Sequence, residues 1–123
     1  LPKSNIKPKG KNIAIVTNAG GAGALITDYL IEKKYNVRKP IDLIGTALAE
    51  DYKIAFNKLK NSKIDSVIAI LPPQAMSQPE ETARKIISFS KYKPVIALFL
   101  GGSSIKKAKE ILKKNNVLCF TNI

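Results

Sequence analysis

The stretch from Thr17 to Gly23, which reads Thr-Asn-Ala-Gly-Gly-Ala-Gly, has the composition of an anion-binding turn. The run before it, Ile13–Val16, is typical of a buried strand, and the run after it, Ala24–Ile31, is typical of a helix. Glycine permits a positive φ and lets another group approach the backbone closely. The first N–H groups of a helix have no internal partners and lie at the positive end of its dipole. We therefore predict an anion site made of backbone amides.

This glycine turn matches neither of the two common nucleotide-binding signatures. Its spacing is not GxGxxG, and no Gly-Lys-Ser/Thr follows it, so the dinucleotide fingerprint and the phosphate loop of nucleotide hydrolases are both excluded. A tight turn that needs glycine only for its own conformation is the alternative interpretation.

The composition excludes several kinds of catalysis. The 123 residues contain no histidine and one cysteine, Cys119, so histidine acid–base chemistry, an internal disulfide and most zinc sites are excluded within the chain. Cys119 lies in an apolar run, where we expect a buried small hydrophobe, which agrees with a reducing cytoplasm. No apolar run is long enough to cross a membrane.

The chain is expected to form one domain behind a short linker. Residues 1–10 contain two prolines and no periodic pattern, which predicts a linker, and residues 11–123 suit a single domain. Because the sequence begins Leu1-Pro2 and not with methionine, we expect a fragment of a longer protein.

The net charge of +12 comes mostly from lysines, which are spread over all the predicted helices. Arginine is scarce, and no aromatic residues alternate with the basic ones as in a base-stacking groove. Solvated helix faces are therefore favoured over a nucleic-acid site, and binding of an anionic polymer is kept as a minor alternative.

Apolar runs alternate with helical patterns along the chain. Strands are predicted at Lys11–Thr17, Pro40–Ile44, Ser66–Leu71, Pro94–Leu100 and Val117–Phe120. Helices are predicted at 22–34 and 49–61, then after a capping box at Ser77, and finally from about Ile105. The inward face of the first helix is predicted to consist of Ala22, Leu25, Ile26, Tyr29 and Leu30.

This order predicts an α/β fold of the flavodoxin-like type. It is a three-layer sandwich with a five-stranded parallel sheet in the order 2-1-3-4-5 and helices on both faces. Ligands of such sheets bind at the carboxyl ends of the strands, beside the switch between strands one and three. A phospho-acceptor receiver domain is excluded, because Thr17-Asn18 and Leu71-Pro72 stand where it needs carboxylates.

The residues Ile15–Gly23 resemble the I-V-T-N-A-G-G-P-G signature of the NDP-forming acyl-CoA synthetases. This class includes the ADP-forming acetyl-CoA synthetases and is related to succinyl-CoA synthetase. Lys39–Leu43 resembles the N-P-V-D-L stretch of the family, and Lys93–Ile96 followed by Phe99–Gly102 resembles K-P-V followed by a Gly-Gly turn. The similarity covers nearly the whole chain and is to the flavodoxin-like subdomain of the CoA-ligase part.

The resemblance implies a ligase that converts acyl-CoA, ADP and phosphate to acid, CoA and ATP through a phosphorylated histidine. It places that histidine, the CoA-binding unit and the ATP-grasp unit in partner domains or subunits of the same enzyme. CoA, ADP or ATP, phosphate, Mg and a small-molecule acid would bind the full enzyme, and no cofactor would bind this fragment alone. No catalytic residue and no metal site is expected within the fragment.

The resemblance also implies a set of binding residues. Phosphate would meet the backbone N–H groups of Gly20, Gly21, Ala22 and Gly23. The acyl substrate would be contacted by Asn18, Pro72, Pro73, Gln74, Gly101 and Gly102. Ala22 and Lys39 depart from the family pattern, which has proline and asparagine there. A non-catalytic regulatory or scaffolding module, for instance one fused to an acyltransferase, is the alternative function.

Overall fold

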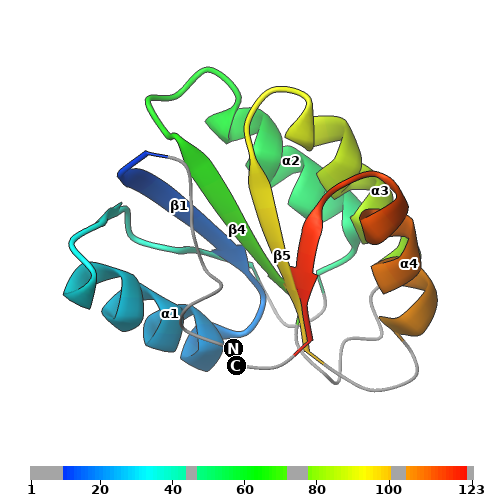
Figure 1. Ribbon diagram of the computed structural model, residues 1–123, viewed down its shortest axis with the longest axis horizontal. Helices are drawn as coiled ribbons and strands as arrows, with labels where there is room; N and C mark the ends of the chain where they lie inside the picture. Colours follow the sequence, from blue (N-terminus) through cyan, green and yellow to red (C-terminus); the bar gives the residue numbers. More distant parts are fainter. Residues whose placement is uncertain (1–9, 44–46, 72–77, 101–104, 122–123) are drawn as a thin grey trace.

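The structure, a computed structural model, describes residues 10–43, 47–71, 78–100 and 105–121, which form an α/β fold on one parallel sheet (Figure 1). The strands are β1 (Asn12–Thr17), β2 (Asn36–Val37), β3 (Ile41–Asp42), β4 (Ser66–Leu71), β5 (Val95–Phe99) and β6 (Leu118–Phe120). The helices are α1 (Gly20–Glu32), α2 (Ala49–Leu59), α3 (Pro79–Ser90) and α4 (Lys106–Lys114). The predicted fold class is confirmed.

The sheet order is β2-β1-β4-β5-β6, and β3 also pairs with β1. The five predicted strands are therefore six, because the edge strand predicted at Pro40–Ile44 is replaced by two short strands. Asn36 pairs with Asn12 at the start of β1, and Asp42 pairs with Thr17 at its end. Proline has no N–H to donate to the ladder, so Pro40 interrupts the pairing between them. Since β2 and β3 occupy one edge position, the predicted order 2-1-3-4-5 is otherwise confirmed.

The helices cover the two faces of the sheet unequally. In Figure 1, α1 lies on one face, and α2, α3 and α4 lie on the other. Ile26 and Leu30 of α1 pack in one core cluster with Ile13 and Ile15 of β1, while α2, α3 and α4 contribute to the other cluster. All residues of β4 are buried, which explains its near-continuous apolar run.

The first helix begins two residues earlier than predicted, at Gly20. Its glycines consequently lie in the first turn with helical backbone angles, and Gly10 is the one glycine of the described residues with a positive φ. Four of the five residues predicted to face inward do so, since Ile26 and Leu30 are buried and Ala22 and Tyr29 pack against the same cluster. Gly23 is also buried, whereas Leu25 is 53% exposed. The prediction for Leu25 is wrong because a buried glycine carries no hydrophobic signal.

The other helices agree more closely with the sequence. The predicted stripe Tyr52, Ala55, Phe56 and Leu59 of α2 is buried. The residue that precedes α3 is Gln78, in a left-handed conformation with φ 51° and no capping side chain, and Ser77 of the predicted capping box lies outside the described residues. Cys119 is half-buried rather than fully buried, and burial raises the pKa of its thiol.

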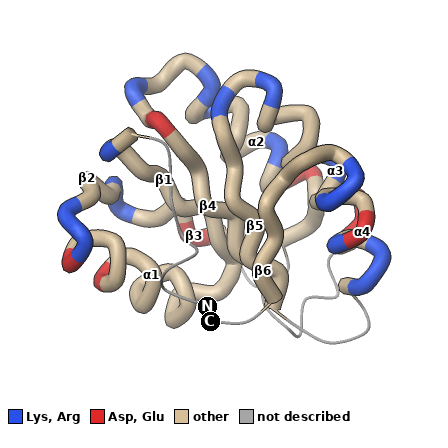
Figure 2. The backbone as a smooth tube through the Cα atoms, viewed as in Figure 1, with Lys and Arg blue, Asp and Glu red and all other residues tan. Residues whose placement is uncertain are grey.

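The basic residues are distributed around the molecule rather than gathered on one face (Figure 2). Within the described ranges the ion pairs are Lys53–Glu50, Arg84–Glu81 and Lys85–Glu50, all of them at the surface. None of the described helices is long and apolar enough to cross a membrane. The same residues include no group of three or more His, Cys, Asp or Glu side chains that could hold a metal ion.

Candidate functional site

The candidate site lies at the carboxyl end of β1, where the chain turns into α1. Thr17 is fully buried, and its Oγ1 accepts a hydrogen bond from the Ala19 N–H at 2.8 Å. The same hydroxyl donates to the Ala19 carbonyl at 3.1 Å. The last side chain of the strand therefore fixes the backbone that opens the helix.

The amino end of α1 is uncapped. The residue before the helix, Ala19, makes no side-chain cap, and the first turn has no acidic residue. Gly23 N–H already donates to the Ala19 carbonyl at 3.0 Å. Among the described residues, the N–H groups of Gly20, Gly21 and Ala22 have no acceptor. Three of the four predicted phosphate-binding amides are thus open, and the fourth is used within the helix.

The three glycines of this turn have different surroundings. A Cβ at Gly23 would lie 3.0 Å from Thr17 Cγ2, so this glycine lets α1 approach β1 closely. A Cβ at Gly20 would lie 3.2 Å from a carboxylate oxygen of Asp42. A Cβ at Gly21 would meet nothing within 4 Å. The packing of this chain therefore requires glycine at position 23 but not at position 21, where the space beside the backbone is open.

Asn18 connects this turn to the neighbouring strand through a buried tyrosine. The residue is only 8% exposed, and its Oδ1 accepts a hydrogen bond from the Tyr52 hydroxyl at 3.1 Å. The Tyr52 hydroxyl also lies 2.6 Å from the Ile70 carbonyl of β4. Burial raises the pKa of the Tyr52 phenol, partly opposed by a hydrogen bond from the Asn18 backbone, so the phenol stays protonated at neutral pH.

The amide nitrogen of Asn18 is buried without a hydrogen-bond partner among the described residues. Buried polar atoms are almost always paired, because an unpaired donor loses its bonds to water without replacement. This unpaired donor, together with the three open backbone amides that follow it in the chain, indicates a place for an acceptor that comes from outside this chain.

The topology brings the ends of the central strands to this same edge. Thr17 is in register with Ile70, and Leu71 is in register with Phe99, so β1, β4 and β5 all end there. The other predicted site residues, Pro72, Pro73, Gln74, Gly101 and Gly102, lie outside the described residues. Their predicted contacts with the acyl group stay predictions.

Sequence reasoning placed Tyr52 in the core stripe of α2 and missed its contact with the site. A signal was present, because a buried tyrosine usually finds a hydrogen-bond partner for its hydroxyl. Asp42 was also missed, and its carboxylate lies beside Gly20. It helps to line a pocket of about 340 Å³ between α1 and β3, together with Thr17, Gly20, Ala24, Thr27, Asp28, Lys39 and Pro40.

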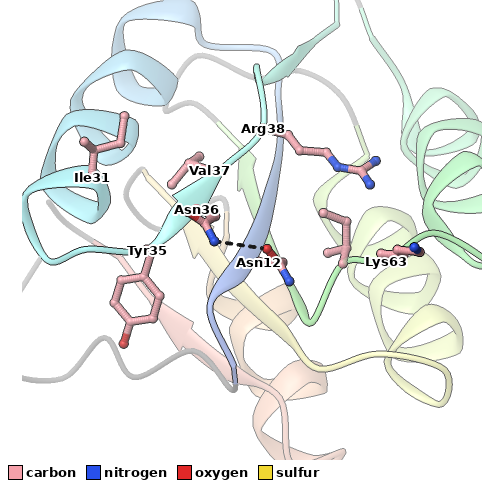
Figure 3. A pocket seen from close by; sticks show the side chains of 8 residues that line it. Asn12, Ile31, Tyr35, Asn36, Val37, Arg38 and Lys63 are labelled. Carbon is pink, nitrogen blue, oxygen red and sulfur yellow. Dashed lines mark hydrogen bonds between the residues drawn. The ribbon is translucent and has the colours of Figure 1, made fainter.

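A larger pocket of about 530 Å³ lies at the opposite edge of the sheet, at the amino ends of β1 and β2 (Figure 3). Its lining consists of Asn12, Ile31, Tyr35, Asn36, Val37, Arg38, Lys63 and Ile64. Asn36 donates a hydrogen bond to Asn12 at 3.4 Å, and both side chains are exposed. Because parallel sheets bind ligands at the carboxyl ends of their strands, we assign the functional site to that edge, where β1 leads into α1.

Comparison with known proteins decides the relationship that the motifs indicate. The chain is 37% identical over 138 aligned residues to the ADP-forming acetate-CoA ligase II subunit alpha of Pyrococcus furiosus. The homologues of this chain include ADP-forming acetate-CoA ligases, of which the chain matches a part. Another is the ligase I subunit alpha of the same organism, at 25% identity. The first match covers 89% of this chain and 30% of the relative, and the second covers 93% and 30%.

Solved structures agree with this relationship. A protein from Pyrococcus horikoshii OT3 superposes with a TM-score of 0.81 at 32% identity, covering 92% of this chain and 32% of that one. The acetyl-CoA synthetase 1 of Ca. Korarchaeum cryptofilum, solved with phosphate and ADP, gives 0.79 at 25% identity, covering 94% and 31%. No protein-family profile matches the chain. The chain spans about a third of the length of these relatives and corresponds to one part of such ligases.

Proposed function

We propose that this chain is the part of an ADP-forming acyl-CoA synthetase that binds an anionic phosphoryl group at the amino end of α1. In the reaction acyl-CoA + ADP + phosphate = acid + CoA + ATP, the open amides of Gly20, Gly21 and Ala22 would hold the phosphoryl oxygens of an acyl phosphate or a phosphohistidine. The histidine, the CoA-binding unit and the ATP-grasp unit would come from partner domains or subunits. CoA, ADP or ATP, phosphate and Mg would bind in the assembled enzyme.

The observation that carries the proposal is the set of unpaired donors between Asn18 and Ala22, where β1 leads into α1. Three backbone N–H groups and the buried Asn18 amide nitrogen have no acceptor among the described residues. Preorganised amides at a helix end stabilise an anion without reorganising, which is what a phosphoryl intermediate needs. The related Korarchaeum enzyme, whose structure contains phosphate and ADP, supports the choice of ligand class.

The chain's own residues would bind and orient in this mechanism and would not transfer protons. Thr17 holds the turn, the three amides contact the phosphoryl oxygens, and the Asn18 amide contacts the carboxylate or acyl phosphate oxygen. With no histidine in the chain, the group that becomes phosphorylated must be delivered by a partner. The isolated chain is therefore expected to make no acyl-CoA at any concentration of ADP and phosphate.

The test replaces Gly21 by valine in the intact enzyme that contains this chain. Because a side chain at position 21 meets nothing within 4 Å, the variant should fold, while its methyl groups obstruct the open amides. Phosphohistidine formation should fall by on the order of 100-fold, the usual cost of losing one oxyanion donor. Leu25→Val, one turn further along the exposed side of α1, is the matched control and should phosphorylate normally. Normal phosphorylation in Gly21→Val would remove α1 from the mechanism.

A further inference from the structure

We propose that Tyr52 is a positioning residue that holds the Asn18 amide with its nitrogen, and not its oxygen, toward the ligand. This inference rests on the proposed function for the identity of the ligand. It adds a residue outside the glycine motif, 34 positions away from Asn18 in the sequence. It also predicts that Asn18 presents a hydrogen-bond donor to the ligand, so that the ligand atom there must be an acceptor.

The position of Tyr52 suits this role. The residue belongs to α2, is 0% exposed, and reaches the carboxyl edge of the sheet with its hydroxyl. There it contacts Asn18, which follows β1, and Ile70, which belongs to β4. These two strands flank the point where the strand order reverses, so one phenol fixes both sides of the ligand site.

The number of available protons determines the orientation of the amide. The Tyr52 hydroxyl has one proton and two neighbouring acceptors, the Ile70 carbonyl and Asn18 Oδ1. When the proton goes to Asn18, the amide oxygen is held on the tyrosine side and Nδ2 is left without a partner. When it goes to Ile70, the amide gains more by rotating so that Nδ2 donates to the phenol oxygen. A ligand oxyanion at Nδ2 selects the first arrangement.

Removing the hydroxyl proton should therefore weaken the binding of anions without changing the packing. In Tyr52→Phe the ring stays, but either end of the Asn18 amide can face the ligand. We expect the KM of the intact enzyme for inorganic phosphate or acetate to rise by about 3-fold to 10-fold, with a smaller change in kcat. Tyr92→Phe is the matched control, because Tyr92 is 59% exposed and does not contact the site.

A second pair of variants tests the polarity of the subsite. Asn18→Ala removes the donor, whereas Asn18→Asp keeps the bond from Tyr52 but presents a carboxylate to the ligand. If the ligand atom is an oxyanion, phosphate and acetate should bind more weakly to Asn18→Asp than to Asn18→Ala. If Asn18→Asp binds either anion as well as the wild type does, the polarity assigned here is wrong.

The side-chain amide signals of Asn18 give a readout that a merely structural role would not change. In the intact wild-type enzyme labelled with ¹⁵N, the two amide protons should shift on addition of inorganic phosphate. In Tyr52→Phe they should broaden or exchange, while backbone amide signals remote from the site stay in place. Sharp, unshifted Asn18 signals in Tyr52→Phe together with unchanged KM values would overturn the positioning role.

The experiment separates this inference from the proposed function. If phosphate shifts neither the Gly21 backbone amide nor the Asn18 side chain of the intact wild-type enzyme, the proposed function fails. If both respond and Tyr52→Phe behaves like the wild type, only the role of Tyr52 fails.

Discussion

The amino ends of α1 and α2 lie on opposite faces of one sheet and are built in opposite ways. At α2, the Ala49 N–H donates to Gln78 Oε1 at 3.2 Å, and the Leu48 N–H donates to the Asp51 carboxylate at 2.8 Å. The first turn of α2 also contains two acidic residues, which complement the helix dipole. At α1, the first turn has no acidic residue, no side-chain cap and three N–H groups without acceptors among the described residues.

This difference indicates that the two helix ends meet different requirements. The α2 end satisfies the N–H groups of Leu48, Ala49 and Asp51 within the chain, which stabilises the fold. The α1 end leaves donors open and contains glycines, which are poor helix formers. An uncapped, glycine-rich helix end next to a buried unpaired amide is costly for a protein that only has to fold. This loss of stability is explained if an anion from a ligand or a partner domain pairs with the unpaired donors.

The largest effect is expected when α1 is given the acidic first turn that α2 has. Gly21→Asp places a carboxylate at the open amides, where nothing within 4 Å obstructs a side chain. It should lower the activity of the intact enzyme by on the order of 100-fold, because the carboxylate occupies and repels the anion site. It should also raise the free energy of unfolding by about 0.3–1 kcal/mol. Steady-state rates and urea denaturation check both parts. If the variant loses activity and its free energy of unfolding also falls, the uncapped α1 end is not explained by anion binding at the expense of stability.

The next effect separates the two roles of glycine within α1. Gly23→Ala places a methyl group 3.0 Å from Thr17 Cγ2, and Thr17 is fixed by its two bonds to Ala19. The free energy of unfolding should fall by about 1–3 kcal/mol through overpacking. Gly21→Ala meets no neighbour and should raise it by about 0.5–1 kcal/mol. Thermal or urea denaturation of the two variants in parallel gives the sign of each change in the free energy of unfolding. If both changes have the same sign, the two glycines do not have different structural roles.

A smaller effect is expected from opening the α2 end. Asp51→Ala removes the carboxylate that accepts the Leu48 N–H, so the free energy of unfolding should fall by about 1 kcal/mol. Phosphate binding should not change, because no anion is expected at this end. Glu50→Ala is the control, since Glu50 has the same charge in the same turn but makes only long ion pairs, at 3.9 and 4.0 Å. If both variants lose equal stability, the dipole rather than the hydrogen bond accounts for the effect.

The sequence predicted the parts of the fold that depend on local pattern. Ser66–Leu71 is a strand with the predicted bounds, and the stripe of α2 from Tyr52 to Leu59 is buried as predicted. Such elements have strong periodicity and clear ends. The carboxyl edge, with Asn18 in it, followed from topology rules that constrain any sheet with these connections.

The remaining features depend on contacts that no local pattern encodes. The hydrogen bond between Tyr52 and Asn18 joins residues 34 positions apart, so the apolar stripe alone could not reveal it. The burial of Gly23 and the exposure of Leu25 in α1 depend on a close approach to Thr17, and glycine has no hydrophobic signal. The division of the edge strand into β2 and β3 depends on Pro40, whose effect on pairing needs the partner strand to be known.

The smallest effect concerns Tyr52, the side chain of α2 that reaches the turn before α1. Burial raises the pKa of its phenol above the ordinary value of 10.0, so the folded protein holds the proton more tightly than the unfolded chain. The resulting stabilisation is fully present below pH 10 and is lost as the pH rises toward the higher pKa of the folded state. Relative to neutral pH, the wild type should lose up to about 1 kcal/mol by pH 10.5 that Tyr52→Phe does not lose. Urea denaturation of both proteins from pH 8 to 10.5 measures the difference. A parallel decline would mean that the phenol ionises as readily in the folded state as in the unfolded one, and that it is not held between Asn18 and Ile70.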